Sequence, residues 1–140
     1  MQNQEPARLY ALVVGLVLVL AGIVGFFYEP SFTSDNSVRD GVFGILDVNG
    51  WHNVVHIATG ALGLFAFAAG VSSSRTYAFA IGAVYVIVAI WGFAVGDGGS
   101  ILGIIPINTE DSVLHLLIGL TGIGVGVASQ SARVSPVGAH

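Results

Sequence analysis

Four long runs of apolar residues dominate the chain, and short polar segments separate them. The runs are Leu9–Tyr28, His52–Val71, Tyr77–Val95 and Ser112–Ala128, and none of them contains Lys, Arg, Asp or Glu. Each is close to the ~20 residues that an α-helix needs to cross a hydrocarbon layer. Because backbone groups find no water inside a bilayer, such runs must be helical. The pattern predicts an all-α membrane protein, a four-helix transmembrane bundle.

The hydrophobic pattern occurs twice along the chain. Arg8–Phe26 aligns with Arg75–Phe93 at an offset of 67 residues, and Gly44–Gly63 aligns with Gly103–Gly122 at an offset of 59. Each copy contains two runs, so both copies enter the membrane in the same direction. We therefore expect a pseudo-twofold axis along the membrane normal. The third run lies in mid-chain, so we expect its counterpart, the first run, to be a permanent span and not a cleaved signal peptide.

The repeats define the layout of the chain. We predict a single four-helix membrane domain over residues 1–140, built from parallel two-helix repeats at 8–72 and 75–131 and followed by a tail at 132–140. The cluster Ser72–Arg75 is expected to form the tight turn between the second and third spans. The repeats differ most in the first outer loop, which is longer than the second.

Composition supports a membrane protein and excludes several function classes. Only 9% of the residues are charged and 54% are hydrophobic, whereas soluble domains carry about 25% charged residues. The net charge of −4, without a basic cluster, gives no nucleic-acid-binding surface. The chain has no cysteine and therefore no disulfide or thiolate chemistry. We expect the lipid bilayer as its surroundings and other membrane proteins, or a second copy of the chain, as partners.

The few arginines predict the orientation. Arg8, Arg75 and Arg133 fall on one side of the predicted bundle, while Arg39 lies on the other side together with seven of the eight acidic residues. By the positive-inside rule, both termini are expected to be cytoplasmic. The expected location is the plasma (inner) membrane, with several passes through it.

Aromatic and apolar residues mark the ends of the spans. Trp51 and Trp91 lie near the outer ends and Tyr10 and Tyr77 near the inner ends, which is typical of interfacial belts. The apolar segments at 44–46 and 103–106 are expected to lie against the outer mouth of the bundle.

One histidine in each repeat shares a helix face with glycines. Residues three, four and seven apart lie on one side of a helix, and glycines there let another helix approach closely. The histidine faces are His56, Gly60 and Gly63 on the second span, and His115, Gly119, Gly122 and Gly126 on the fourth. Asn49 and Asn108, each seven residues before its histidine, are expected to be helix N-caps.

Three explanations of the histidines remain open. In the first, each imidazole hydrogen-bonds to the other repeat and fixes the two halves together, without any cofactor. In the second, His56 and His115 bind haem, or His52, His56, Asp111 and His115 bind a divalent transition metal such as zinc. In the third, the bundle carries a small solute or protons, although no carboxylate lies inside any run.

The segment Asn49–Gly63, NGWHNVVHIATGALG, is echoed by Asn108–Gly119, NTEDSVLHLLIG. With this pattern the chain resembles, over Arg8–Ala128, an uncharacterised group of small prokaryotic four-helix membrane proteins, a domain of unknown function. A looser likeness, in size and number of spans, is to the DoxX-like membrane proteins. The resemblance implies the architecture and a plasma-membrane location, and no reaction. We expect a structural or interaction subunit that is not an enzyme, with haem or metal binding as the alternative.

Overall fold

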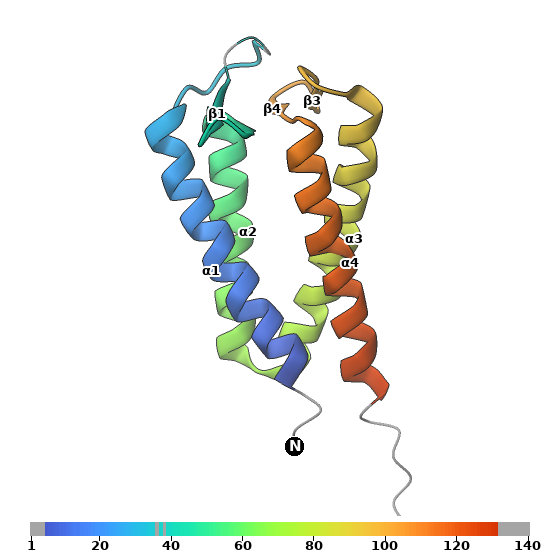
Figure 1. The fold of residues 1–140 in the computed structure, drawn as a ribbon. Helices are drawn as coiled ribbons and strands as arrows, with labels where there is room; N and C mark the ends of the chain where they lie inside the picture. The colour runs from blue at the N-terminus through green and yellow to red at the C-terminus, as the bar shows by residue number, and fades with distance from the viewer. Residues whose placement is uncertain (1–4, 36, 38, 132–140) are drawn as a thin grey trace, which may run out of the picture.

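The computed structural model describes residues 5–35, 37 and 39–131. Arg133 and the rest of the predicted tail at 132–140 lie outside the described residues. Within them the chain forms four helices, α1 (Glu5–Tyr28), α2 (Gly50–Ala69), α3 (Val71–Val95) and α4 (Thr109–Ser131) (Figure 1). Each helix has an apolar segment long enough to cross a membrane. The predicted all-α, four-helix membrane bundle is confirmed.

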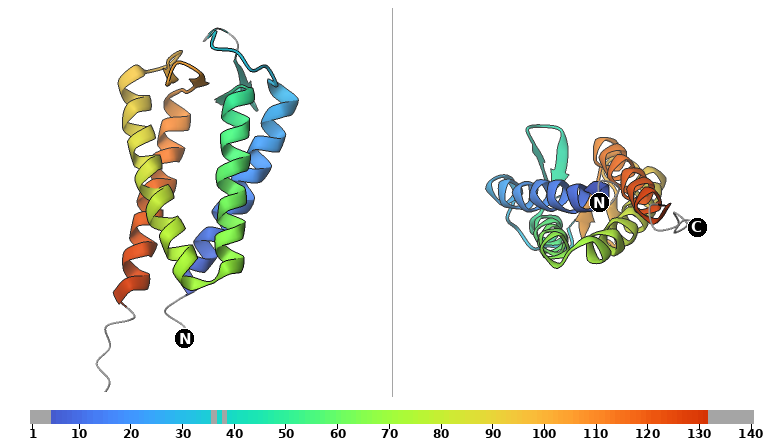
Figure 2. Two further views of the ribbon diagram at one scale, coloured as in Figure 1. Left: turned by 180° about the vertical axis from the view of Figure 1, so that it is seen from behind. Right: turned by 90° about the horizontal axis from the view of Figure 1, so that it is seen from below.

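The helices pack as two close pairs, α1 with α2 and α3 with α4 (Figure 2). Glycines lie where the paired backbones approach each other. A Cβ atom added at Gly15 would lie 2.9 Å from the carbonyl oxygen of Gly60, and one added at Gly82 would lie 2.9 Å from that of Gly119. Both pairs therefore depend on the absence of side chains at these positions, as small-residue interfaces in membranes do.

Two buried tyrosines connect the helix pairs. The Tyr10 hydroxyl of α1 donates to the Ile118 carbonyl of α4 over 2.8 Å, and the Tyr77 hydroxyl of α3 donates to the Thr59 carbonyl of α2 over 3.1 Å. We expected both tyrosines in an interfacial belt, and this prediction is wrong, because they are only 5% and 7% exposed. Gly122 leaves the space that the Tyr10 hydroxyl occupies. A tyrosine near a span end can turn inward when the facing helix offers a carbonyl and a glycine.

The turn between α2 and α3 is shorter than predicted. Ser72–Arg75 does not form it, since α3 already begins at Val71. Gly70 alone reverses the chain, with φ of 110°, and its N–H donates to the Ala66 carbonyl. The Ser74 hydroxyl donates to the same carbonyl. The hydroxyl thereby adds a second donor to a carbonyl in the last turn of α2, where carbonyls run short of helical partners.

Each helix pair carries a small antiparallel hairpin at the end of the bundle away from the N-terminus (Figure 1). The strands β1 (Asp40–Val42) and β2 (Leu46–Val48) form one hairpin, and β3 (Ser100–Ile101) and β4 (Ile105–Pro106) form the other. The hydrophobic pattern along the chain did not predict these strands. Two or three residues are too few for an alternating pattern to be recognised.

The two hairpins have equivalent turns and equivalent contacts with the opposite half. Phe43 and Leu102, 59 positions apart, both have φ of 55°. The side-chain amide of Asn49 donates to the Ile104 carbonyl, and that of Asn108 donates to the Ile45 carbonyl, over 2.7 and 2.6 Å. Each hairpin is thus held by the asparagine at the start of a helix in the other half.

Candidate metal centre

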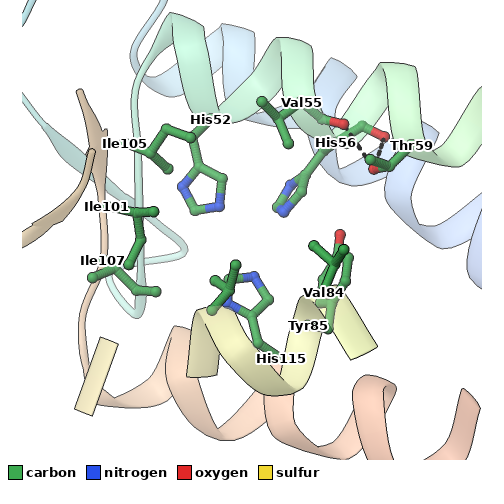
Figure 3. A pocket seen from close by; sticks show the side chains of 11 residues that line it. His52, Val55, His56, Thr59, Val84, Tyr85, Ile101, Ile105, Ile107 and His115 are labelled. Carbon is green, nitrogen blue, oxygen red and sulfur yellow. Dashed lines mark hydrogen bonds between the residues drawn. The ribbon is translucent and has the colours of Figure 1, made fainter. Parts of the chain in front are cut away.

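Three histidine side chains converge between α2, α4 and the second hairpin. One ring nitrogen from each of His52, His56 and His115 lies within 4.8 Å of the other two. The ring centroids of His52 and His56 are 4.4 Å apart, and that of His115 is 6.0 and 6.1 Å from them. Figure 3 shows the rings of His52 and His56 pointing from α2 toward the ring of His115, which rises from α4.

The helix N-termini place these histidines. The Asn49 side-chain oxygen accepts the backbone N–H of His52 over 3.0 Å, and the Asn108 oxygen accepts that of Asp111 over 2.8 Å. Both asparagines therefore sit where N-caps were expected. Because each cap fixes the first turn of its helix, the histidine seven residues later is brought to the same distance from the helix start in both halves.

A backbone carbonyl orients His52. Its Nδ1 lies 2.9 Å from the carbonyl oxygen of Asp47 in β2. A carbonyl only accepts hydrogen bonds, so this contact requires the proton on Nδ1, which leaves the lone pair of the neutral ring on Nε2. Histidines that bind metals are commonly held in this way, with one ring nitrogen on a carbonyl and the other on the ion.

The other two histidines have unpaired nitrogens. Nδ1 of His56 and Nδ1 of His115 are buried and have no hydrogen-bond partner. Burying a polar group without a partner costs roughly 1–3 kcal/mol by mutational estimates. The hydrogen bonds between halves that we expected of the histidines are made by the tyrosines and asparagines described above. The rings are therefore available to a ligand.

Asp111, the fourth predicted ligand, does not join the three histidines. Its Oδ2 accepts the backbone N–H of Asp47 over 3.0 Å and that of Asn108 over 3.3 Å. The second contact is that of a capping box, in which the acidic residue at the third helical position binds the N-cap amide. Residues His52 and Pro106 occupy the positions equivalent to Asp111 and Asp47. Proline has no N–H to donate. A carboxylate at position 52 would therefore lack the backbone donor that Asp47 gives to Asp111.

The space between the rings is small and mostly apolar. The cavity has a volume of about 70 Å³, and isoleucines of the second hairpin and valines of α2 and α3 line it. Tyr85 closes one side, with its ring 5.0 Å from that of His115. Sites for cofactors and drug-sized ligands occupy about 300–1,000 Å³. The cavity has room for an ion with a water molecule and not for haem.

Sequence reasoning missed the parts of the site that come from the hairpins. Ile101, Ile105 and Ile107 cover the cavity, and the Asp47 carbonyl orients His52. The only available signal was the recurrence of apolar residues at equivalent positions of the first hairpin, at Val42, Leu46 and Val48. The contact between His52 and the Asp47 carbonyl could not be predicted, because every residue has a backbone carbonyl and such a contact leaves no signature in the sequence.

A comparison with known proteins identifies one matching family. The model of one family, described as Domain of unknown function (DUF4383), matches residues 8–128. No curated protein and no solved structure matches the chain. The match covers the segment on which we based the resemblance to an uncharacterised membrane-protein family. The looser likeness to DoxX-like proteins is not shown by these comparisons.

Proposed function

Because the chain belongs to the DUF4383 family, whose description assigns no activity, we propose its function from the site: it binds a divalent transition-metal ion through His52, His56 and His115. The single observation that carries this proposal is the convergence of three ring nitrogens within 4.8 Å. Ligand atoms around tetrahedral zinc are about 3.3 Å apart, given Zn–N distances of about 2.0–2.1 Å. Small rotations of the rings would close the set on an ion.

The donor chemistry selects the class of metal. Three imidazoles suit Zn²⁺, Cu²⁺ and Ni²⁺, whereas Mg²⁺ and Ca²⁺ prefer oxygen ligands. Three protein ligands also leave one tetrahedral position open. The imidazoles are neutral, so the bound ion keeps its full charge, and an anion such as hydroxide or chloride is the fourth ligand we expect.

Charge at the hairpin end supports a cation as the ligand. Asp35, Asp40, Asp97 and Glu110 are exposed there, and carboxylates around the mouth of a site raise the local concentration of cations. Arg8 and Arg75 lie at the opposite end, where Arg8 stacks on Phe67. By the positive-inside rule we propose that the termini are cytoplasmic, that the membrane is the plasma membrane, and that the ion arrives from outside.

We assign binding to this protein and no catalysis. Apart from the imidazoles, the residues that line the cavity supply only the hydroxyls of Thr59 and Tyr85 and no carboxylate. A structural or interaction subunit without metal is the second candidate. The exposed hairpin tips favour it, since Phe43 and Leu102 are 75% and 68% exposed and would suit contact with another membrane protein or a second copy.

Elemental analysis of the purified protein tests the proposal. We expect one Zn²⁺ or Cu²⁺ ion per chain after equilibration and removal of excess metal. His52→Ala, His56→Ala and His115→Ala should each weaken binding at least tenfold, because loss of a partner that merely orients a ligand already costs about 10–100-fold. Asp111→Asn is the control, and it should keep the ion.

Two results would contradict metal binding. One is a full complement of metal in all three histidine variants. The other is metal-free wild-type protein whose thermal stability falls in those variants, which would instead support the structural candidate. A Soret band in the visible spectrum would show haem and would overturn the argument from cavity volume.

A further inference from the structure

A second and larger cavity also borders His56. Its volume is about 350 Å³, and it is bounded by α1, the first hairpin and the N-terminal end of α4. Val17, Leu20, Ala21 and Val24 form its α1 wall. His56 lines both cavities, so the two are neighbours in the outer half of the bundle.

The second cavity occupies the position equivalent to the histidine cavity. On the helices, Val17 and Ala21 correspond to Val84 and Val88 at the offset of 67. On the hairpins, Val42, Leu46 and Val48 correspond to Ile101, Ile105 and Ile107 at the offset of 59. Each half of the bundle therefore builds a cavity under its own hairpin.

Side-chain size explains why the cavities differ in volume. Ala21 faces the second cavity where Val88 faces the first, and Val42 and Val48 stand where the first has isoleucines. Tyr85, which fills one side of the histidine cavity, corresponds to Leu18. The second cavity is partly open along α1, and its volume of about 350 Å³ falls in the range of ligand pockets, about 300–1,000 Å³.

The lining and the access define the class of ligand. Val17 and Leu20 are 52% and 58% exposed on the face of α1 that meets lipid, so a ligand enters from the bilayer. Eight of the ten lining residues are apolar, and the two others are His56 and Asp111. A carboxylate repels an anionic head group and accepts a hydrogen bond from a hydroxyl.

We infer that the second cavity binds a neutral lipid, with its hydrocarbon chain against α1 and its hydroxyl group beside Asp111 and His56. This lipid site does not require the metal, because His56 is the one lining residue that the two cavities share. The nearest alternative is an ordinary annular phospholipid that touches the same surface without selectivity.

Photolabelling with a long-chain alcohol tests the site. The protein is reconstituted in phosphatidylcholine vesicles with hexadecanol that carries a diazirine in its chain, and labelled peptides are mapped by mass spectrometry. We expect labels within residues 17–24 and 42–48, and we expect excess unlabelled hexadecanol to reduce them at least fivefold. Hexadecanoic acid should compete poorly.

Filling the cavity provides the matched variants. Val24→Trp introduces the residue that α3 carries at the equivalent position, Trp91, and should abolish labelling at 42–48. Ile23→Trp places the same ring on the neighbouring lipid-facing position, 45% exposed, and should leave labelling unchanged. If Val24→Trp does not fold, Ala21→Val replaces it as a milder change that fills part of the cavity and should reduce the same labelling.

Uniform labelling of all lipid-facing helix surfaces, without competition by hexadecanol, would show annular lipid only and would overturn the inference. Metal content is measured on the same samples and should not change in Val24→Trp, so failure of the lipid site and failure of the metal site are separate outcomes.

Discussion

At the scale of single residues, two tyrosines and two asparagines make polar contacts between the helix pairs. Tyr10 and Tyr77 act within the bundle, and Asn49 and Asn108 act at its hairpin end. All four donate to backbone carbonyls of the other half. The histidines are thereby relieved of a structural task, and this is the residue-level reason to assign them a ligand.

Tyr10→Phe should lower the free energy of unfolding by about 0.5–1.5 kcal/mol, the usual net contribution of one hydrogen bond. The ring is retained, so its packing against Tyr77, with centroids 6.3 Å apart, does not change. Thermal unfolding in detergent measures the effect. Tyr28→Phe keeps the ring contact with Phe43 and should be close to neutral. An equal loss in both variants would argue against the Tyr10 hydrogen bond.

At the scale of elements, each helix pair is set by its glycines, and the starts of α2 and α4 are set by their caps. Gly60 and Gly119 permit backbone contact within the pairs. The first amide of α4, that of Thr109, is held by the Asp97 side chain, whereas the first amide of α2, that of Gly50, is held by the Ser31 carbonyl. The two helices thus begin at equivalent places with different chemistry.

Gly60→Ala should destabilise the fold by about 1–3 kcal/mol, the usual cost of overpacking. The added Cβ would lie 2.6 Å from the backbone nitrogen of Val19, which cannot move without moving α1. Gly124→Ala is the control, since nothing lies within 4 Å of its added Cβ. There the better helix propensity of alanine should raise the melting temperature slightly. Equal effects of both changes would contradict close pairing of α1 and α2.

Asp97 should make the start of α4 sensitive to acid. The hydroxyl of Thr109, and then its N–H, donate to Asp97 and hold the pKa of this carboxyl below its ordinary 3.8. The ionised group therefore stabilises the fold above that pH, and its contribution is lost as the pH falls through the lowered pKa. Asp97→Asn should be less stable than wild type at neutral pH, with the difference in melting temperature shrinking in acid. A difference independent of pH would exclude the ionised hydrogen bond.

At the scale of the whole molecule, the three proposed metal ligands come from both halves. His52 and His56 belong to the α1–α2 half and His115 to the α3–α4 half. At the same end, Arg39 bridges the halves by pairing with Asp47 and donating to the Gly98 carbonyl. A bound ion would therefore act as a further link between two units that are otherwise joined by side-chain hydrogen bonds and packing.

Metal binding should stabilise the whole bundle. At a free Zn²⁺ concentration one hundred times the dissociation constant, the expected gain is about 2.7 kcal/mol, and a chelator should reverse it. His115→Ala should abolish the shift in melting temperature, because it removes the only ligand from the second half. An unchanged shift in that variant would show that zinc stabilises the protein from elsewhere.

The spans were predictable because uncharged runs of about twenty residues have few alternatives to a membrane helix. The histidines were predictable as a pair of faces because helical periodicity places His56 with Gly60 and His115 with Gly119. The directions of the side chains could not be predicted. Tyr10 points into the bundle, and Asp111 binds backbone amides and does not join the three histidine rings. These outcomes depend on which carbonyl or N–H the opposite half offers, and the sequence does not encode backbone positions locally.

Pro106 makes the two halves of the bundle differ at the hairpin end. Where Asp47 presents an amide hydrogen to the carboxylate of Asp111, the equivalent proline has none. An acidic residue at position 52 would be buried there with one donor fewer, which is costly, while an imidazole can instead donate its N–H to the Asp47 carbonyl. One missing backbone hydrogen thus removes a donor for an acid at one of two matching positions. A nearly symmetric scaffold in this way holds an imidazole at one position and a carboxylate cap at the other.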